Sequence, residues 1–181
     1  MACIALGVGT MHAHATKAGE QAPVPARWPA ASNLPHAGVT IAMFVHPECP
    51  CTRASLASLA TAVGDHTNAT ITIVASNRLS GSTAHLASSV AGARVMLDVD
   101  GTEAARFGAK TSGQVVAYDA DGHLVFAGGI TAARGHIGPN VGASSIASII
   151  AGTEPITSAR DVFGCSLREA HPTGVDQQAR Q

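Results

Sequence analysis

Short apolar runs of β-forming residues alternate with segments of helical spacing through the middle of the chain. Residues 39–46 (VTIAMFVH) and 69–75 (ATITIVA) are apolar almost throughout, as expected for strands buried on both faces. Between them, leucine and alanine recur at helical spacing in residues 53–63, and Thr52 is placed to cap this helix. Because strands separated by helices pair in parallel through right-handed crossovers, the pattern predicts an α/β fold.

The later elements complete this prediction. They are a helix at 80–90, a short strand at 93–98, a brief helix at 102–107, strands at 114–119 and 123–127, and a helix at 142–151. Asp121-Gly122, between the last two strands, is typical of a hairpin turn. The expected order is β-α-β-α-β-α-β-β-α. The hairpin adds an antiparallel strand, so a central mixed sheet flanked by helices is predicted.

The ends of the chain differ in character from its middle. Residues 1–11 are apolar but shorter than the roughly 20 residues that cross a bilayer, and a stretch rich in proline and alanine follows at 16–35. We therefore expect residues 1–38 to be a signal or anchor remnant with a linker, which indicates the bacterial cell envelope and a membrane tether. The alternative is a disordered cytoplasmic tail. Residues 39–153 form the predicted domain, and residues 154–181 a C-terminal tail.

Composition narrows the possible functions. Lysine and arginine (11) nearly balance aspartate and glutamate (12), and no basic stretch is interleaved with aromatics, so a nucleic-acid partner is not expected. The chain also lacks a Gly-x-Ser-x-Gly elbow and a phosphate-binding glycine loop.

Chemistry is expected at Cys49-Pro50-Cys51, the turn between the first strand and the first helix. A cysteine at a helix N-terminus feels the helix dipole and unpaired N–H groups, which lower its pKa and favour the reactive thiolate. A disulfide between Cys49 and Cys51 would close a small, strained ring, and strained disulfides are the more oxidising ones. The alternative is a pair of inert core cysteines.

Four pieces of sequence carry a resemblance to a known superfamily: residues 44–56 (FVHPECPCTRASL), 93–113, 114–131, and the late ARGHIGPNVG and VFGC. Over residues 39–165 the chain resembles the thioredoxin superfamily, most closely the membrane-tethered branch related to TlpA and ResA, and within it the RedB group. The resemblance implies a thiol–disulfide oxidoreductase that acts on a protein thiol or disulfide partner. Its redox centre is the disulfide, so it requires no organic cofactor.

Two departures from the family pattern shape the site prediction. The family has Cys-x-x-Cys, whereas here Glu48 stands at the attacking position and Cys51 at the resolving one. We expect Cys49 to attack and Cys51 to resolve. Glu48 is a candidate proton acceptor, and the alternative is a plain solvated turn residue. The family's cis-proline is replaced by Ser112, expected in trans. By analogy with the family, Pro50, Thr111 and Ser112 line the partner groove.

Other functions remain open. The SCO-type copper chaperones share this fold and use two cysteines with a distant histidine, so Cys49, Cys51 and His136 could hold copper, and His46 is a further candidate. Cys165 could be a resolving thiol, a third metal ligand or free. A domain that only docks partners is a third reading.

Overall fold

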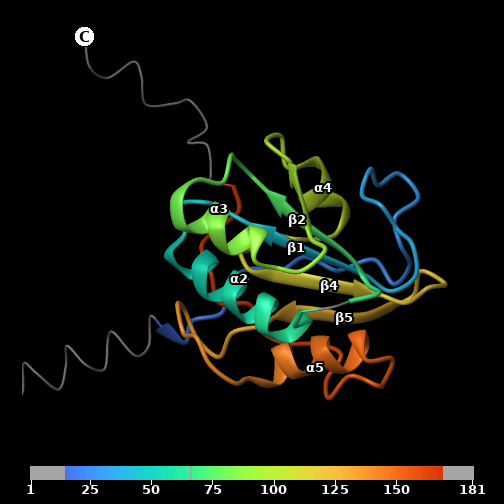
Figure 1. The fold of residues 1–181 in the computed structure, drawn as a ribbon. Coiled ribbons are helices and arrows are strands. Elements are labelled where there is room, and N and C mark those ends of the chain that lie inside the picture. Colours follow the sequence, from blue (N-terminus) through green and yellow to red (C-terminus); the bar gives the residue numbers. More distant parts are fainter. Residues whose placement is uncertain (1–14, 66, 169–181) are drawn as a thin grey trace, which may run out of the picture.

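The computed structural model, which describes residues 15–65 and 67–168, contains one mixed sheet with helices on both faces (Figure 1). Its strands are β1 (Thr40–Val45), β2 (Thr70–Ala75), β3 (Arg94–Leu97), β4 (Gln114–Tyr118) and β5 (Leu124–Gly129). Its helices are α2 (Pro50–Val63), α3 (Gly81–Ser88), α4 (Thr102–Arg106) and α5 (Val141–Ile150). The predicted order of elements is confirmed. No helix within the described residues is both long enough and apolar enough to span a bilayer.

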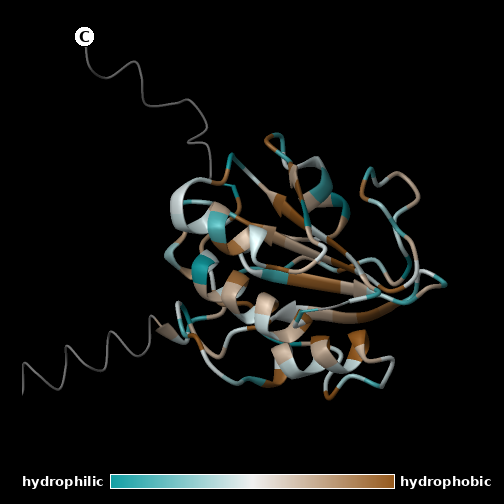
Figure 2. Cartoon of the chain, in the orientation of Figure 1, coloured by the Kyte–Doolittle hydropathy of each residue, from teal (hydrophilic) through white to brown (hydrophobic). Residues whose placement is uncertain are grey.

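The sheet order is β3-β2-β1-β4-β5. β1 pairs in parallel with β2 and antiparallel with β4, and β4 pairs antiparallel with β5. Every residue of β1 is buried, which explains its apolar sequence on both faces. The strands are hydrophobic along most of their length (Figure 2). This mixed sheet confirms the predicted thioredoxin-like α/β fold.

The two faces of the sheet bury separate cores. Helices α2, α3 and α5 cover one face, on which Ile41 and Met43 of β1 meet Leu56, Leu59 and Ile146 of the helices. On the other face, alternate residues of the strands pack against α4 and both chain ends, in a cluster that includes Ala42, Phe44, Tyr118, Phe107 and Leu167. The second core therefore depends on the described segments before β1 and after α5, which lie outside the predicted domain of residues 39–153.

The segment expected to be a linker is packed onto the domain. It is extended, and the ring of Trp28 packs edge-on against Phe107 and Tyr118. The Tyr118 hydroxyl donates to the Pro25 carbonyl at 2.8 Å, and the Trp28 N–H donates to the Gly122 carbonyl at 2.8 Å. These contacts attach the segment to the domain, where it covers apolar surface that α4 leaves open. Residues 1–14 lie outside the described residues, so the signal or anchor stays a prediction.

After α5 the tail runs beside β5. The Arg160 N–H donates to the Ala127 carbonyl at 3.2 Å. Two glycines of β5 make room for this path, because a Cβ on Gly128 would lie 2.4 Å from the Arg160 oxygen and one on Gly129 would lie 2.5 Å from the Asp161 oxygen. The described part of the predicted tail is thus packed against the sheet, and it leads the chain toward the start of α2.

Candidate active site

Helix α2 begins at Pro50 rather than at the predicted residue 53, with Cys49 as its N-cap residue. Proline suits the first helical position because its missing N–H needs no partner there. Thr52, expected to cap the helix, instead donates its hydroxyl to the His46 carbonyl at 2.7 Å. The earlier start places the Cys49 sulfur at the positive end of the helix dipole.

Cys49 is paired with Cys165, which is 116 residues later in the sequence. The two Sγ atoms are 2.8 Å apart, and the Cys165 N–H also points to the Cys49 sulfur at 3.3 Å. Cys49 is only 3% exposed. The structure therefore brings Cys165 into the site, a placement that the sequence analysis left undecided.

The surroundings separate the acidities of these thiols. Burial by itself raises the pKa of Cys49, but hydrogen bonds from the Cys165 thiol and N–H and from Cys51 outweigh it, so the Cys49 pKa is lowered. Burial and the hydrogen bond to Cys49 raise the pKa of Cys165 to about 11. The Cys49 thiol is thus the more acidic of the pair, which agrees with Cys49 as the nucleophile.

Cys51 contacts both Cys49 and the loop that follows β5. It is buried on α2, and its pKa is raised by burial and by the nearby Cys49. The Gly135 N–H and the charge of Arg134 oppose this increase. Neither residue was predicted from the sequence to belong to the site, although both stand in the ARGHIGPNVG stretch that carries part of the resemblance.

The histidine of that same loop does not join the thiols. His136 is exposed, and its backbone N–H donates to the Ala133 carbonyl at 3.2 Å. Among the described residues, the ligand atoms of Cys49, Cys51 and His136 do not all lie within 4.8 Å of one another. The copper hypothesis therefore lacks a gathered ligand set in this conformation.

A cluster of three possible metal ligands does occur in the described chain, at the exposed β4–β5 turn, formed by Asp119, Asp121 and His123. The Asp119 carboxylate accepts the backbone N–H groups of Asp121 and His123 at 3.0 and 2.8 Å. These hydrogen bonds stabilise the β4–β5 turn, and they account for the position of the Asp119 carboxylate without a metal ion.

Ser112, whose backbone N–H donates to the Cys165 carbonyl, is fully buried. The described chain contains no cis peptide bond, so Ser112 is trans, as expected. Its hydroxyl oxygen accepts the His46 N–H at 2.9 Å and lies 2.9 Å from the Thr52 hydroxyl. These bonds tie the end of β1 to the start of α2.

Residues 162–167, named here the tail segment, lie antiparallel to residues 110–112. The Ser112 N–H donates to the Cys165 carbonyl at 2.8 Å, and the Leu167 N–H donates to the Lys110 carbonyl at 2.9 Å. A bridge between Thr111 and Ser166 fixes the register. Cys165 is thereby held over Cys49.

This arrangement changes the expectation of an open partner groove. Thr111 is 2% exposed because the chain covers it from two sides, the tail segment and residues 19–20. Its hydroxyl donates to the Glu20 carbonyl at 2.7 Å. Thr111 and Ser112 therefore line a filled site, whereas Pro50 is exposed.

Glu48 is also exposed, and its side chain forms no hydrogen bond or ion pair within the described residues. Its carboxylate thus lies at the surface beside the turn, not in the buried surroundings of the thiols. Its role as a proton acceptor stays a prediction.

No family model and no curated protein matches the chain. Among solved structures, an uncharacterized conserved protein from Geobacillus kaustophilus is 17% identical, with a TM-score of 0.60 over 85% of this chain and 93% of that one. A hypothetical protein from Sinorhizobium meliloti is 19% identical, with a TM-score of 0.58 over 83% and 93%. A secreted Mycobacterium tuberculosis disulfide oxidoreductase homologous to E. coli DsbE matches 49% of this chain and 67% of its own, at 23% identity and a TM-score of 0.42. At these identities, the first two likenesses show a shared fold alone.

Proposed function

We propose that the protein is a thiol–disulfide oxidoreductase in which Cys49 is the attacking sulfur. One observation carries this proposal: a thiol of lowered pKa, at a helix N-terminus, lies 2.8 Å from a second thiol. Thiolate is the species that attacks disulfides, and a second thiol nearby is needed to release the product. The resemblance of the Cys49-Pro50-Cys51 turn to the thioredoxin active turn points the same way.

The reaction needs only sulfur chemistry. The Cys49 thiolate attacks one sulfur of a partner protein's disulfide, forms a mixed disulfide and releases the other sulfur as a thiolate. A second thiol of this chain then attacks the Cys49 sulfur and releases the partner's first sulfur. Two electrons pass from the protein to the partner, and the reverse sequence oxidises a partner dithiol.

We place this activity in the bacterial cell envelope, where disulfides persist. The apolar residues 1–11, followed by the stretch rich in proline and alanine, support a membrane tether. Fractionation of the native host, with an antibody against the folded domain, tests this placement. Recovery of the protein in the cytosolic fraction would contradict it.

The activity is tested with a chromogenic aryl disulfide as the oxidant and dithiothreitol as the reductant. We expect wild-type turnover and its loss in Cys49→Ser, because the attacking thiolate is gone. The matched control is His136→Ala, which should turn over normally, since His136 is exposed and outside the thiol cluster.

The same proteins, titrated with Cu(I), test the alternatives. A copper chaperone predicts poor disulfide turnover in the wild type and weakened Cu(I) binding in Cys49→Ser, Cys51→Ser and His136→Ala alike. A wild-type protein that neither exchanges disulfides nor holds Cu(I) would leave the docking domain as the remaining reading.

A further inference from the structure

We propose that Cys165, rather than Cys51, closes the disulfide with Cys49, and that the tail segment must leave its position before an outside disulfide can reach Cys49. The inference deepens the proposed function and rests on it. It assigns two tasks to one segment: supplying the resolving thiol and covering the attacking one.

The geometry favours Cys165 as the partner. Its sulfur lies 2.8 Å from that of Cys49, and a disulfide bond is about 2.05 Å long, so a sub-ångström movement suffices. The Cys51 thiol is also hydrogen-bonded to Cys49, but Cys51 is already part of α2 and has the Gly135 N–H and Arg134 beside it. A bond from Cys49 to Cys51 would require a small strained ring at the first turn of a helix.

Backbone contacts of the tail segment hold Cys165 in register. On one side of Cys165, a Cβ on Gly164 would lie 1.9 Å from the Ser112 oxygen, so this approach requires glycine. On the other side, Leu167 is buried in the second core. At its start, the Val162 carbonyl accepts the Gly19 N–H at 2.8 Å. The segment is therefore anchored before and after the thiol.

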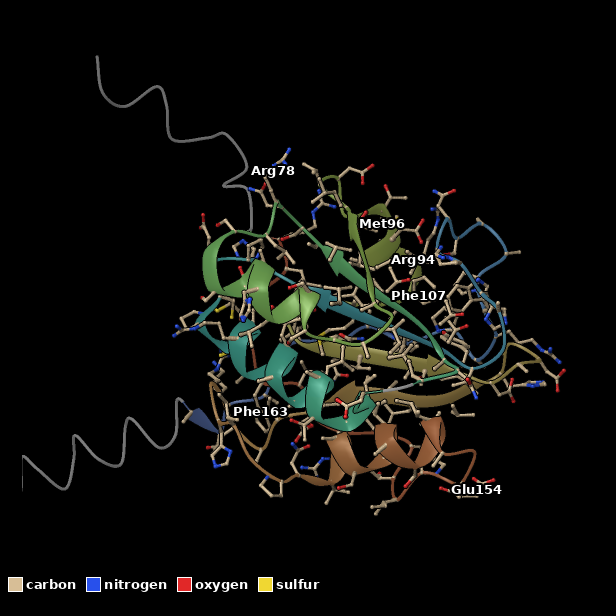
Figure 3. The ribbon with its side chains drawn as sticks, in the orientation of Figure 1. Arg78, Arg94, Met96, Phe107, Glu154 and Phe163 are labelled. Atoms are coloured by element: carbon tan, nitrogen blue, oxygen red, sulfur yellow. The ribbon has the colours of Figure 1, made fainter. Side chains whose placement is uncertain are left out.

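The same contacts cover Cys49, which is 3% exposed although it stands at the end of a helix. Figure 3 places Phe163 on the side of the molecule where α2 begins, far from Met96 and Phe107. A partner disulfide has to meet the Cys49 sulfur in line, along a direction that the Cys165 thiol and N–H now occupy. Attack on an outside disulfide thus requires the tail segment to move first.

The proposed cycle reduces a partner disulfide in two exchange steps. With the tail segment displaced, the Cys49 thiolate attacks the partner disulfide and expels one partner thiolate. The tail segment returns, Cys165 loses its proton and attacks the Cys49 sulfur, and the second partner sulfur leaves and takes up a proton. The protein ends with a Cys49–Cys165 disulfide, and the partner has gained two electrons and the proton of Cys165, while the partner thiolate expelled first takes its proton from water.

The first experiment identifies the disulfide in the full chain. Wild-type protein is oxidised with diamide, alkylated and digested with trypsin without reduction. We expect the peptide 161–168, which contains Cys165, to be linked to the peptide 28–53, which contains Cys49 and Cys51. The link should persist in Cys51→Ser and vanish in Cys49→Ser. An oxidised wild type with Cys165 alkylated and Cys49 joined to Cys51 would overturn the inference and leave the proposed function intact.

The second experiment asks which thiol resolves. A peptide disulfide probe is added in stoichiometric amount, and mixed disulfides are counted by intact mass. We expect Cys165→Ser to accumulate the mixed disulfide on Cys49, whereas Cys51→Ser and wild type release the probe. Accumulation in Cys51→Ser with release in Cys165→Ser would assign resolution to Cys51. Turnover data then separate this failure from a failure of the proposed function, which would abolish exchange in every variant.

The third experiment tests the cover. Gly164→Val should unseat the tail segment and speed iodoacetamide labelling of Cys49 by about tenfold, the factor for losing one net hydrogen bond. The matched control is Ser166→Val, a neighbour whose side chain is exposed. Labelling is read by peptide mass in a Cys51→Ser background. Equal labelling rates in Gly164→Val and Ser166→Val would show that the tail segment does not shield Cys49.

Discussion

Oxidation of the thiol pair should stabilise the protein strongly if Cys49 joins Cys165. The bond would connect residues 116 positions apart. The chain-entropy relation for a loop of that length gives about 5 kcal/mol of added stability near room temperature. A Cys49–Cys51 bond would close a minimal loop, for which the same relation gives less than about 2 kcal/mol before ring strain is subtracted. The two pairings therefore differ in a quantity that unfolding experiments resolve.

The assay is urea unfolding of the oxidised and reduced wild type, followed by far-UV circular dichroism. With a slope of about 2.5 kcal/mol per molar urea, the oxidised midpoint should lie about 2 M higher. Cys51→Ser should retain this difference, and Cys165→Ser should lose it. Oxidised and reduced wild type with midpoints closer than about 0.5 M would refute the reasoning, because no long loop would then have been closed.

Three further predictions follow from single contacts. Because the pKa of Cys49 is lowered, its thiolate persists to lower pH, and the stopped-flow rate of attack should rise with pH through a pKa below that of an ordinary thiol. The rate of disulfide closure by Cys165 should keep rising with pH toward the Cys165 pKa of about 11. A single ordinary thiol pKa for both rates would contradict this. Ser112→Pro removes the N–H that holds the Cys165 carbonyl, so alkylation of Cys165 should accelerate relative to Ser112→Ala, which keeps that N–H; identical rates would count against the contact. Trp28→Ala should lower the free energy of unfolding by about 3 kcal/mol in a urea titration, since its ring packs on Phe107 and Tyr118, and a loss below about 1 kcal/mol would show that the segment is only loosely attached.

The regular elements were predictable because their signals are local. Runs that are apolar almost throughout marked β1 and β2 to within a residue, since strands buried on both faces admit few polar side chains. The start of α2 was misplaced because Thr52 is a good capping residue by type, whereas its hydroxyl here serves the His46 carbonyl. A local sequence pattern shows which residue types suit a position, but the choice of hydrogen-bond partner depends on which acceptors lie nearby in the folded chain.

The composition of the active site was less predictable because it depends on pairing between distant segments. Cys165 reaches Cys49 through backbone bonds from residues 110–112, and backbone bonds leave almost no trace in residue type. The traces that do exist are glycines: Gly128 and Gly129 in a strand, and Gly164 before the cysteine. The loop containing His136 lies beside the site, since its Gly135 contacts Cys51, but the direction of one exposed side chain could not be inferred from the sequence.

The pairing of Arg160 with β5 has a kinetic consequence. If that pairing holds while the tail segment is displaced, Cys165 remains tethered to β5 by five residues, which span at most about 17 Å. A short tether keeps the effective concentration of the Cys165 thiol near Cys49 in the millimolar range or above. Resolution of a mixed disulfide would then be a first-order event within one molecule. Its rate would not depend on how much glutathione or other free thiol surrounds the protein.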